Sequence, residues 1–543
     1  MTTEATATPA AGAPDSDEPA PNGRLRTLGI AIADRPYIIT AALIGLIILL
    51  DISGPDWPAA IFRAQLVKEH GAVLWNNQWY GGHLLPGYSV ITPVLSAVFG
   101  TSSAIGTRVL TALSCITSAW AWSRLDVGRN LLARRVGSCW FAVMASVDYL
   151  IGRTPFALGV AAGLLAVLAA RNQRLYWAGA ASLISGLASP LAGAFLLMAA
   201  LAWVPRTNVW PTRLSFAPAG VGLLTSLAFP NEGMFPFPWW RFWPIIALAV
   251  VGLWLLPPSQ RTARRFLVLY ALSAIVFFFV PSALGGNLAR LGEMVAGPMM
   301  AIVLLSLGRR RLVILLAVPL LVWGFQSAAL AITHDRADSK GKSAEYYDGV
   351  LGYLEQANQP LGRIEIPFTR GHWESVYVAD KMPLARGWER QLDRHFNAVL
   401  YQELLTAPEY RAWIEEMGVR FVALPDVPID KSSQPEVDLI KSGVPWLKPV
   451  WSDKHWQVWE VENPKPLLEG PGRLTSLTPS EFSFVADRPG TFTVRIHPTS
   501  WFVADRKGVH IEPDKDDEWT TIVVDTPGPV TIRADQSKLL PVP

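Results

Sequence analysis

The chain has 543 residues, of which 51% are hydrophobic and 17% are charged, and its mean hydropathy is positive. This composition is too apolar for an ordinary soluble protein of several domains, and it predicts that much of the chain lies in a lipid bilayer. The net charge is only +3, and the arginines fall in short connections between apolar runs, so nucleic-acid binding has no support. Both cysteines, Cys115 and Cys139, lie in apolar segments, so neither a disulfide framework nor a thiolate metal site is expected.

The first residues of the chain, 1 to about 23, are rich in Ala, Pro, Thr and acidic residues, which predicts a disordered tail that we extend to 1–35. A transmembrane region follows at 36–333. Its arginines fall on alternate connections, which by the positive-inside rule places the N-terminus in the cytoplasm and everything after residue 331 outside the plasma membrane. Apolar stretches that could cross about 30 Å of hydrocarbon occur at about eleven places: 36–51, 103–123, 136–151, 155–170, 175–188, 190–204, 215–230, 243–257, 266–282, 292–307 and 311–331.

The first outer connection, 51–102, is long and carries carboxylates, arginine, histidines, tryptophans and a Gly-Gly turn. Its segment from Pro86 to Gly100 resembles a span, but a span there would invert the charge pattern of every later connection. We therefore expect a pair of short helices on the outer surface. After residue 331, helices mix with short strands, and alternating strands follow later, which predicts an extracytoplasmic α/β domain at 334–465 and a β-sandwich at 466–543.

Several residues of the first outer loop could carry chemistry. Asp56 opens a predicted helix that has Pro58 at its start and Gly71 past its end, so Asp56 could act in catalysis or only cap the helix. Asp51 could act likewise or only mark the end of the first span. Three further residues could contact a sugar or belong to a turn and the interfacial aromatic belt: Trp79, Tyr80 and His83.

Ionisable residues recur near the outer ends of the predicted spans, where they are costly unless paired or functional. Guanidinium groups suit phosphate, so these residues could line an outward-facing cavity for an anionic headgroup. The segment with Glu389 and Arg390 could hang over that cavity or form a surface ion-pair cluster. Arg290 and Glu293 could form a structural pair. The residues at the outer span ends are Arg108, Asp148 with Arg153, Glu232 with Arg241, and Arg290 with Glu293, and Arg63 lies in the first loop.

These features resemble the GT-C superfamily of polytopic glycosyltransferases, which use polyprenyl-phosphate-linked sugars. The resemblance rests on a carboxylate soon after the first span, the interfacial helices of the long first loop, the segments 86–93 and 99–108, and an exported C-terminal domain. The whole chain, including 385–393 and 419–425, is similar to uncharacterised actinobacterial membrane proteins of that kind. The implied fold is an α-helical polytopic membrane protein with a C-terminal α/β domain and a terminal β-sandwich.

The resemblance implies that a sugar passes from a polyprenyl-phosphate-linked donor to a cell-envelope glycan or glycolipid, as in bacterial cell wall biosynthesis. Asp56, or secondarily Asp51, would be the general base. No metal ligand set follows, because Asp56 precedes Trp57 rather than a second acid, although a divalent metal stays an option. The implied phosphate-binding residues are Arg63, Arg108, Arg153 and Arg290, and the implied substrate contacts are Trp79, Tyr80, His83, Asp148, Glu293, Glu389 and Arg390.

Two other classes of function stay open. A transporter or flippase of lipid-linked precursors would need ionisable or broken helix positions near the bilayer midplane, whereas the charges here gather at the outer ends. Ser189-Pro190 and Pro319 keep this class in consideration. A non-catalytic envelope assembly factor would use the β-sandwich to bind envelope polymers.

Overall fold

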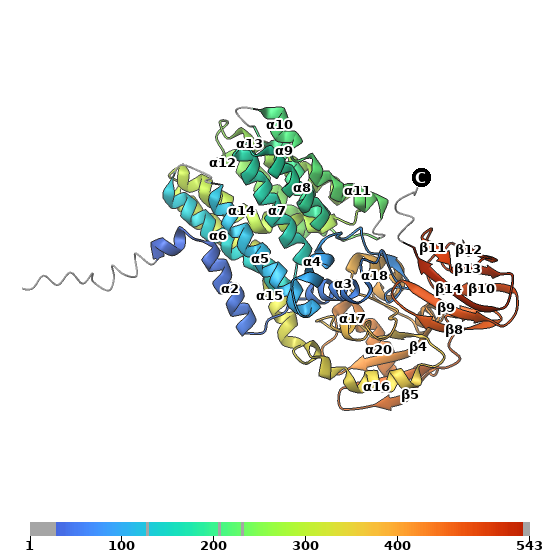
Figure 1. Cartoon of the computed structure of the whole chain (residues 1–543). Coiled ribbons are helices and arrows are strands. Elements are labelled where there is room, and N and C mark those ends of the chain that lie inside the picture. The colour runs from blue at the N-terminus through green and yellow to red at the C-terminus, as the bar shows by residue number, and fades with distance from the viewer. Residues whose placement is uncertain (1–28, 126–129, 205–207, 230–232, 536–543) are drawn as a thin grey trace, which may run out of the picture.

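The computed structural model describes residues 29–125, 130–204, 208–229 and 233–535 (Figure 1). Most of the tail predicted at 1–35 lies outside these residues. Helices dominate the chain up to Ala337, and the longer strands all follow residue 362 within the described ranges. The protein therefore has a helical N-terminal part and a C-terminal part that contains the sheets.

Four helices of the described chain are long and apolar enough to cross a membrane: Thr154–Arg171, Arg261–Phe279, Gly285–Ser306 and Arg310–Ala337. Shorter apolar helices accompany them. The helices of this part are α2 (Tyr37–Leu49), α5 (Ser103–Arg124), α6 (Leu131–Ile151), α7 (Thr154–Arg171), α8 (Leu175–Ala188), α9 (Pro190–Ala202), α10 (Val209–Leu214), α11 (Val221–Ala228), α12 (Trp239–Leu255), α13 (Arg261–Phe279), α14 (Ala289–Ser306) and α15 (Arg310–Ala337).

The predicted number of eleven crossing helices is not confirmed. The stretch expected as a span at 215–230 is instead a four-residue 3₁₀ turn, Ala217–Gly220, followed by the eight residues of α11. Eight helical residues extend roughly 12 Å, which is less than half of a hydrocarbon core of about 30 Å. The apolar composition predicted this helix but not its length.

The first loop contains α3 (Trp57–His70), a small hairpin of β1 (Trp75–Asn76) and β2 (His83–Leu84), and α4 (Thr92–Val98). The helix predicted between Asp56 and Gly71 is confirmed as α3, with Pro58 in its first turn and Gly71 at φ +77° beyond its end. Where a pair of short helices was expected between Pro86 and Gly100, only α4 forms. The residues before α4 are turns and bends.

After α15 the chain builds a mixed sheet with strand order β3-β4-β6-β5, in which β3 and β4 are parallel and the other pairs are antiparallel. Short helices surround this sheet. The strands are β3 (Arg363–Glu365), β4 (Val419–Pro425), β5 (Leu447–Ser452) and β6 (Trp456–Val461), and the helices are α16 (Asp348–Ala357), α17 (Glu374–Tyr377), α18 (Arg390–Phe396), α19 (Ala407–Glu416) and α20 (Gln434–Ser442).

The last strands form two antiparallel four-stranded sheets, ordered β12-β13-β10-β7 and β11-β14-β9-β8. Alternate side chains are buried, as in β9, where Phe482 and Phe484 point into the core and Ser483 does not. This alternation is typical of sheets with one covered face. The strands are β7 (Leu468–Glu469), β8 (Gly472–Leu477), β9 (Glu481–Ala486), β10 (Gly490–Val494), β11 (Phe502–Ala504), β12 (Val509–Pro513), β13 (Thr520–Val524) and β14 (Gly528–Ala534).

The helical part and the mixed sheet share one hydrophobic core. Buried side chains of α3, α6 and α15 belong to the same cluster as those of β3, β4 and β6. Figure 1 shows α3 and α17 close together between the helices and the sheets. The first loop therefore lies at the junction of the two parts.

Candidate functional site

A cavity of about 770 Å³ lies at this junction. Its walls come from α3, from the ends of several membrane helices, and from residues 388–391 of the C-terminal part. The polar lining residues include Asp56, Arg63, Tyr88, Arg153, Arg241, Asn287, Arg290, His334, Glu389, Arg390 and Gln391. The cavity brings together six residues predicted from the sequence, namely Asp56, Arg63, Arg153, Arg290, Glu389 and Arg390.

Asp56 lies at the N-terminal end of α3 and lines the cavity. Its backbone N–H donates to the Ile151 carbonyl at 3.0 Å, which fixes the start of α3 against the end of α6. Its carboxylate accepts no hydrogen bond from the first turn of α3. The hypothesis that Asp56 only caps the helix is therefore wrong, because in the first turn of α3, all of whose residues the structure describes, no backbone N–H donates to its carboxylate.

One cavity arginine, Arg63, forms a buried ion pair with Glu389. Its guanidinium carbon also lies 4.2 Å from the ring centroid of Tyr88. Burial raises the pKa of the Glu389 carboxyl, and the charge of Arg63 opposes that rise. The pair joins α3 to the C-terminal part, so the cavity wall at 388–391 is not a loose surface loop.

A second cavity arginine, Arg153, follows α6 and is held by two carboxylates. Its Nη1 atom lies 3.4 Å from Asp148 Oδ1 and 3.9 Å from Glu293 Oε2. The other polar contacts of Glu293 are with Gln326 and Ser327. Asp148 and Glu293 do not line the cavity. The expected pairing of Glu293 with Arg290 is wrong, since Glu293 lies beside Arg153 instead.

A third cavity arginine, Arg390, belongs to the C-terminal part. Its Nη2 atom donates to Asp430 Oδ2 at 2.9 Å, and its guanidinium carbon lies 5.0 Å from the ring centroid of Trp388. The Trp388 indole N–H donates to the Pro55 carbonyl at 2.6 Å, one residue before Asp56. The segment 388–391 is therefore held on two sides, by Pro55 through the Trp388 indole and by Asp430 through the Arg390 guanidinium.

Two cavity arginines, Arg241 and Arg290, differ from the other three. Within the described ranges, neither has a carboxylate within ion-pair distance or a hydrogen-bond acceptor, and each contacts a phenyl ring, Phe235 and Phe156 respectively. A buried guanidinium without a partner is costly. The arrangement therefore leaves these two cations available to an anion that enters the cavity.

The aromatic residues expected to contact a sugar, Trp79, Tyr80 and His83, lie behind the cavity wall and do not line it. The Tyr80 hydroxyl donates to the Gly387 carbonyl and accepts the backbone N–H of Glu389 at 2.8 Å. The His83 ring stacks on Trp79, with 5.9 Å between centroids. Burial lowers the pKa of the His83 imidazole to about 3. These side chains hold residues 387–389 in place.

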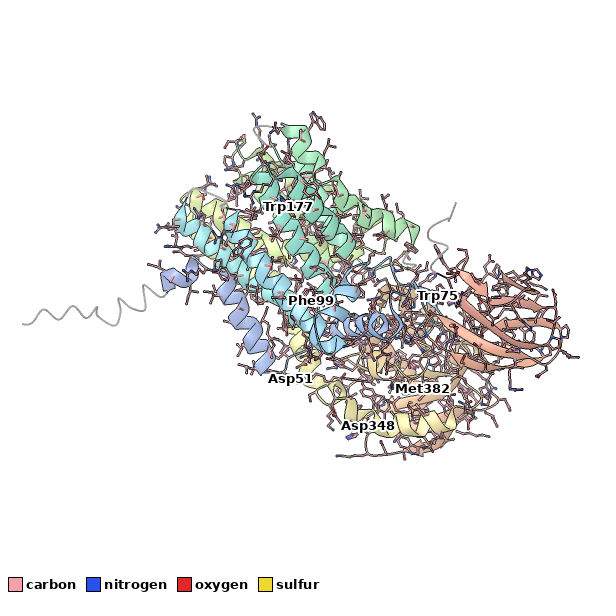
Figure 2. All side chains as sticks on the ribbon, viewed as in Figure 1. Asp51, Trp75, Phe99, Trp177, Asp348 and Met382 are labelled. Atoms are coloured by element: carbon pink, nitrogen blue, oxygen red, sulfur yellow. The ribbon has the colours of Figure 1, made fainter. Side chains whose placement is uncertain are left out.

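The hairpin that carries these residues continues into the C-terminal sheets. Trp75, labelled in Figure 2, belongs to the buried core of the last two sheets. Its ring contacts Phe502 edge to face, with 5.6 Å between the ring centroids. The Asn77 backbone N–H donates to the Pro479 carbonyl at 2.7 Å. The aromatic richness of the hairpin therefore reflects packing against the C-terminal part.

Two predicted residues lie away from the cavity. Asp51 is exposed at the end of α2 (Figure 2), where its carboxylate lies 3.1 Å from Lys342 Nζ. Arg108 lies on α5, where it donates to Ser53 Oγ at 3.1 Å and its guanidinium carbon is 5.6 Å from the Trp57 ring centroid. Neither lines the cavity. Asp51 lies close to Asp56 in the chain, but of these two carboxylates only Asp56 lines the cavity.

Arg241 belongs to the predicted set of ionisable residues at the outer span ends, although it was not among the implied phosphate-binding residues, and the structure places it in the cavity lining. Glu232, of the same set, lies outside the described residues. Tyr88 lies in the apolar segment expected on the outer surface, and it gives no separate chemical signal. Among the described residues there is no group of three or more His, Cys, Asp or Glu side chains that could hold a metal ion.

No known family profile and no curated protein matches the chain. Among solved structures, the chain is similar to ArnT from Cupriavidus metallidurans bound to undecaprenyl phosphate, with a TM-score of 0.43, 13% identity, and 81% of this chain and 98% of that chain covered. The apo state of the same protein gives a TM-score of 0.41 and 15% identity, with 81% of this chain and 98% of that chain covered.

Proposed function

We propose that the protein is a membrane glycosyltransferase that takes a sugar from a polyprenyl-phosphate-linked donor and transfers it to a hydroxyl group of a cell-envelope glycan or glycolipid. The observation that carries this proposal is that the Asp56 carboxylate, which makes no capping hydrogen bond, lines one cavity with two guanidinium groups, Arg241 and Arg290, that no described carboxylate neutralises. A carboxylate that can accept a proton and cations that can receive a phosphate are the two requirements of such a transfer. We place the cavity and the C-terminal part on the outer face of the plasma membrane.

The proposed reaction uses Asp56 as the general base. The acceptor hydroxyl gives its proton to the Asp56 carboxylate while its oxygen forms a bond to the anomeric carbon of the donor sugar. The bond between that carbon and the phosphate oxygen breaks, and its electron pair leaves with the polyprenyl phosphate. General-base assistance of this kind contributes roughly 10²–10⁴-fold to a rate.

Arg241 and Arg290 are the proposed phosphate-binding residues. The leaving phosphate has a low pKa and needs little protonation, so cationic stabilisation of its developing charge is the larger requirement. Guanidinium forks match phosphate oxygens in pairs. The other three cavity arginines already have carboxylate partners: Arg63 pairs with Glu389, Arg153 with Asp148 and Glu293, and Arg390 with Asp430. We therefore propose that these three line the cavity near the phosphate and do not bind it directly.

The cavity also offers an apolar side for a lipid-linked donor. Leu227 of α11 and Leu330 of α15 both line it, yet they are 78% and 57% exposed. An apolar side chain that lines a cavity and is also exposed marks a place where the cavity opens to its surroundings, which for these helices is the bilayer. We propose that the polyprenyl chain enters between these helices, and that the acceptor lies toward residues 388–391.

The test is a transfer assay with purified full-length protein, a panel of polyprenyl-phospho-sugars and envelope glycan or glycolipid acceptors. We compare wild type with Asp56→Asn and with Asp51→Asn as the matched control. Asp56→Asn should lose about 10²–10⁴-fold in turnover, whereas Asp51→Asn should keep near-wild-type turnover because its carboxylate is exposed and outside the cavity. Equal turnover of both variants, or no transfer from any donor, would overturn the proposal.

A further inference from the structure

A second basic hollow, of about 620 Å³, lies at the other end of the membrane helices. It is lined by Asp34, Arg35, Tyr37, Ser123, Arg124 and Arg134. These residues lie before or at the start of α2, at the end of α5 and at the start of α6, three helices that pack against one another. Figure 1 shows the start of α2 on the side of the helical part away from the C-terminal sheets. This hollow is therefore distinct from the cavity that contains Asp56.

The charge of the hollow is strongly positive. Asp34, the one carboxylate among the described lining residues, is already bound by Arg135, whose Nε and Nη2 atoms donate to Oδ1 and Oδ2 at 2.7 and 2.8 Å. Within the described part of the chain, neither Arg35 nor Arg124 has a carboxylate partner, and the Arg124 guanidinium carbon lies 5.7 Å from the Trp120 ring centroid. No described carboxylate therefore neutralises these two guanidinium groups at the edge of an apolar helix bundle.

The surroundings of the hollow suit a lipid better than a free ion. Ile38 of α2 and Leu131 of α6 lie close in the chain to the hollow, and both are exposed. Tyr37 and Trp120 add the amphipathic rings that are typical of the membrane interface. A phosphodiester headgroup could lie against the arginines while its acyl chains run along the apolar helix surfaces. Basic pockets between membrane helices bind anionic headgroups in this way.

We propose that this hollow is a binding site for the headgroup of an anionic phospholipid, with Arg35 and Arg124 as the main phosphate ligands. The Tyr37 hydroxyl is a further donor of the lining, whereas the Ser123 hydroxyl already donates to the Trp120 carbonyl at 2.7 Å. The site would hold α2, α5 and α6 together at one face of the membrane. It does not depend on the proposed glycosyl transfer.

The test uses purified full-length protein stripped of lipid, to which phosphatidylglycerol, phosphatidylcholine or inorganic phosphate is added. Native mass spectrometry counts bound lipid, and thermal unfolding measures the stabilisation. Wild type should retain phosphatidylglycerol and not phosphatidylcholine. Each arginine near an anionic headgroup contributes to the affinity for the lipid. The double variant Arg35→Gln/Arg124→Gln, which removes both charges, should therefore bind phosphatidylglycerol about 30-fold more weakly.

The matched control is Arg171→Gln/Arg174→Gln, which removes the same charge from exposed residues outside the hollow. It should bind phosphatidylglycerol as wild type does, and Arg35→Lys/Arg124→Lys should restore part of the binding. Equal binding by the Arg35→Gln/Arg124→Gln variant and the control would overturn the proposal. Stabilisation by inorganic phosphate equal to that by phosphatidylglycerol would also overturn it, in favour of a site for free phosphate.

Discussion

Residues 51–85 of the first loop fall into two halves, 51–70 and 71–85, which are similarly rich in polar and aromatic residues, but the structure uses them differently. The first half brings Asp56 and Arg63 to the cavity. The second half buries Trp75 in the core of the last two sheets and places Tyr80 under residues 387–389. A loop rich in polar and aromatic residues can therefore serve to pack against residues far away in the chain, and need not carry a reaction.

Among the variants proposed, Trp75→Ala in the second half of the loop should lose the most stability. Trp75→Ala removes a buried indole from a sheet core, which typically costs about 3–5 kcal/mol. Thermal unfolding in detergent should show a large loss for Trp75→Ala and little change for Trp177→Ala, since Trp177 is 65% exposed on α8 (Figure 2). Asp56→Asn should unfold as wild type does. If Trp75→Ala unfolds at the wild-type temperature, the packing role of the hairpin is wrong.

The second prediction concerns Arg290 in the cavity, whose loss should change donor binding and not stability. Arg290→Gln removes a guanidinium that no described carboxylate neutralises, so the protein should not lose stability. The donor KM should rise roughly 10- to 100-fold, because a hydrogen bond to a charged group contributes about 1.5–3 kcal/mol. Arg290→Lys keeps the positive charge but lacks the paired N–H donors of a guanidinium, so its donor KM should lie between those of wild type and Arg290→Gln. Unchanged KM for Arg290→Gln in a steady-state donor titration would remove Arg290 from the phosphate site.

A smaller effect follows from the pH dependence of the hairpin. Burial lowers the pKa of His83 to about 3, so the folded state holds this ring neutral while the unfolded state binds a proton below about 6.5. Stability from this group is therefore present above pH 6.5 and is lost as the pH falls toward 3, with about 2 kcal/mol lost between pH 7 and pH 5.

Thermal unfolding at pH 7 and pH 5 tests this expectation in wild type and in His83→Asn. The wild type should lose more stability than the variant over this interval, because the asparagine does not titrate. A variant that loses as much stability as the wild type would show that other groups dominate the acid response. The measurement would then place His83 outside the pH-sensitive contacts.

The sequence predicted those features that depend on local patterns. Pro58 and Gly71 bound α3, alternating apolar residues identified strands such as β9, and ionisable residues at the ends of predicted spans identified Arg153 and Arg290. Such signals need no knowledge of distant contacts.

The sequence could not predict features that depend on residues far apart in the chain. Arg63 and Glu389 are separated by 326 positions, and Trp75 meets Phe502 in a core that no local pattern places next to it. Arg241 carries the same span-end signal as Arg290, so composition alone could not rank one above the other. Whether a helix such as α11 crosses the membrane depends on where its apolar stretch stops, which hydropathy describes only loosely.

The cavity wall at Trp388 and Glu389 also has a consequence for how the protein is made. The ribosome synthesises these residues after every membrane helix, yet Trp388 and Glu389 contact Pro55 and Arg63 near the beginning of the chain. The cavity therefore lacks this wall while the helices insert, and it is completed only when the C-terminal part has folded onto the first loop. A chain cut short after its last membrane helix would enter the membrane with an incomplete cavity, so the proposed transfer would require the C-terminal part.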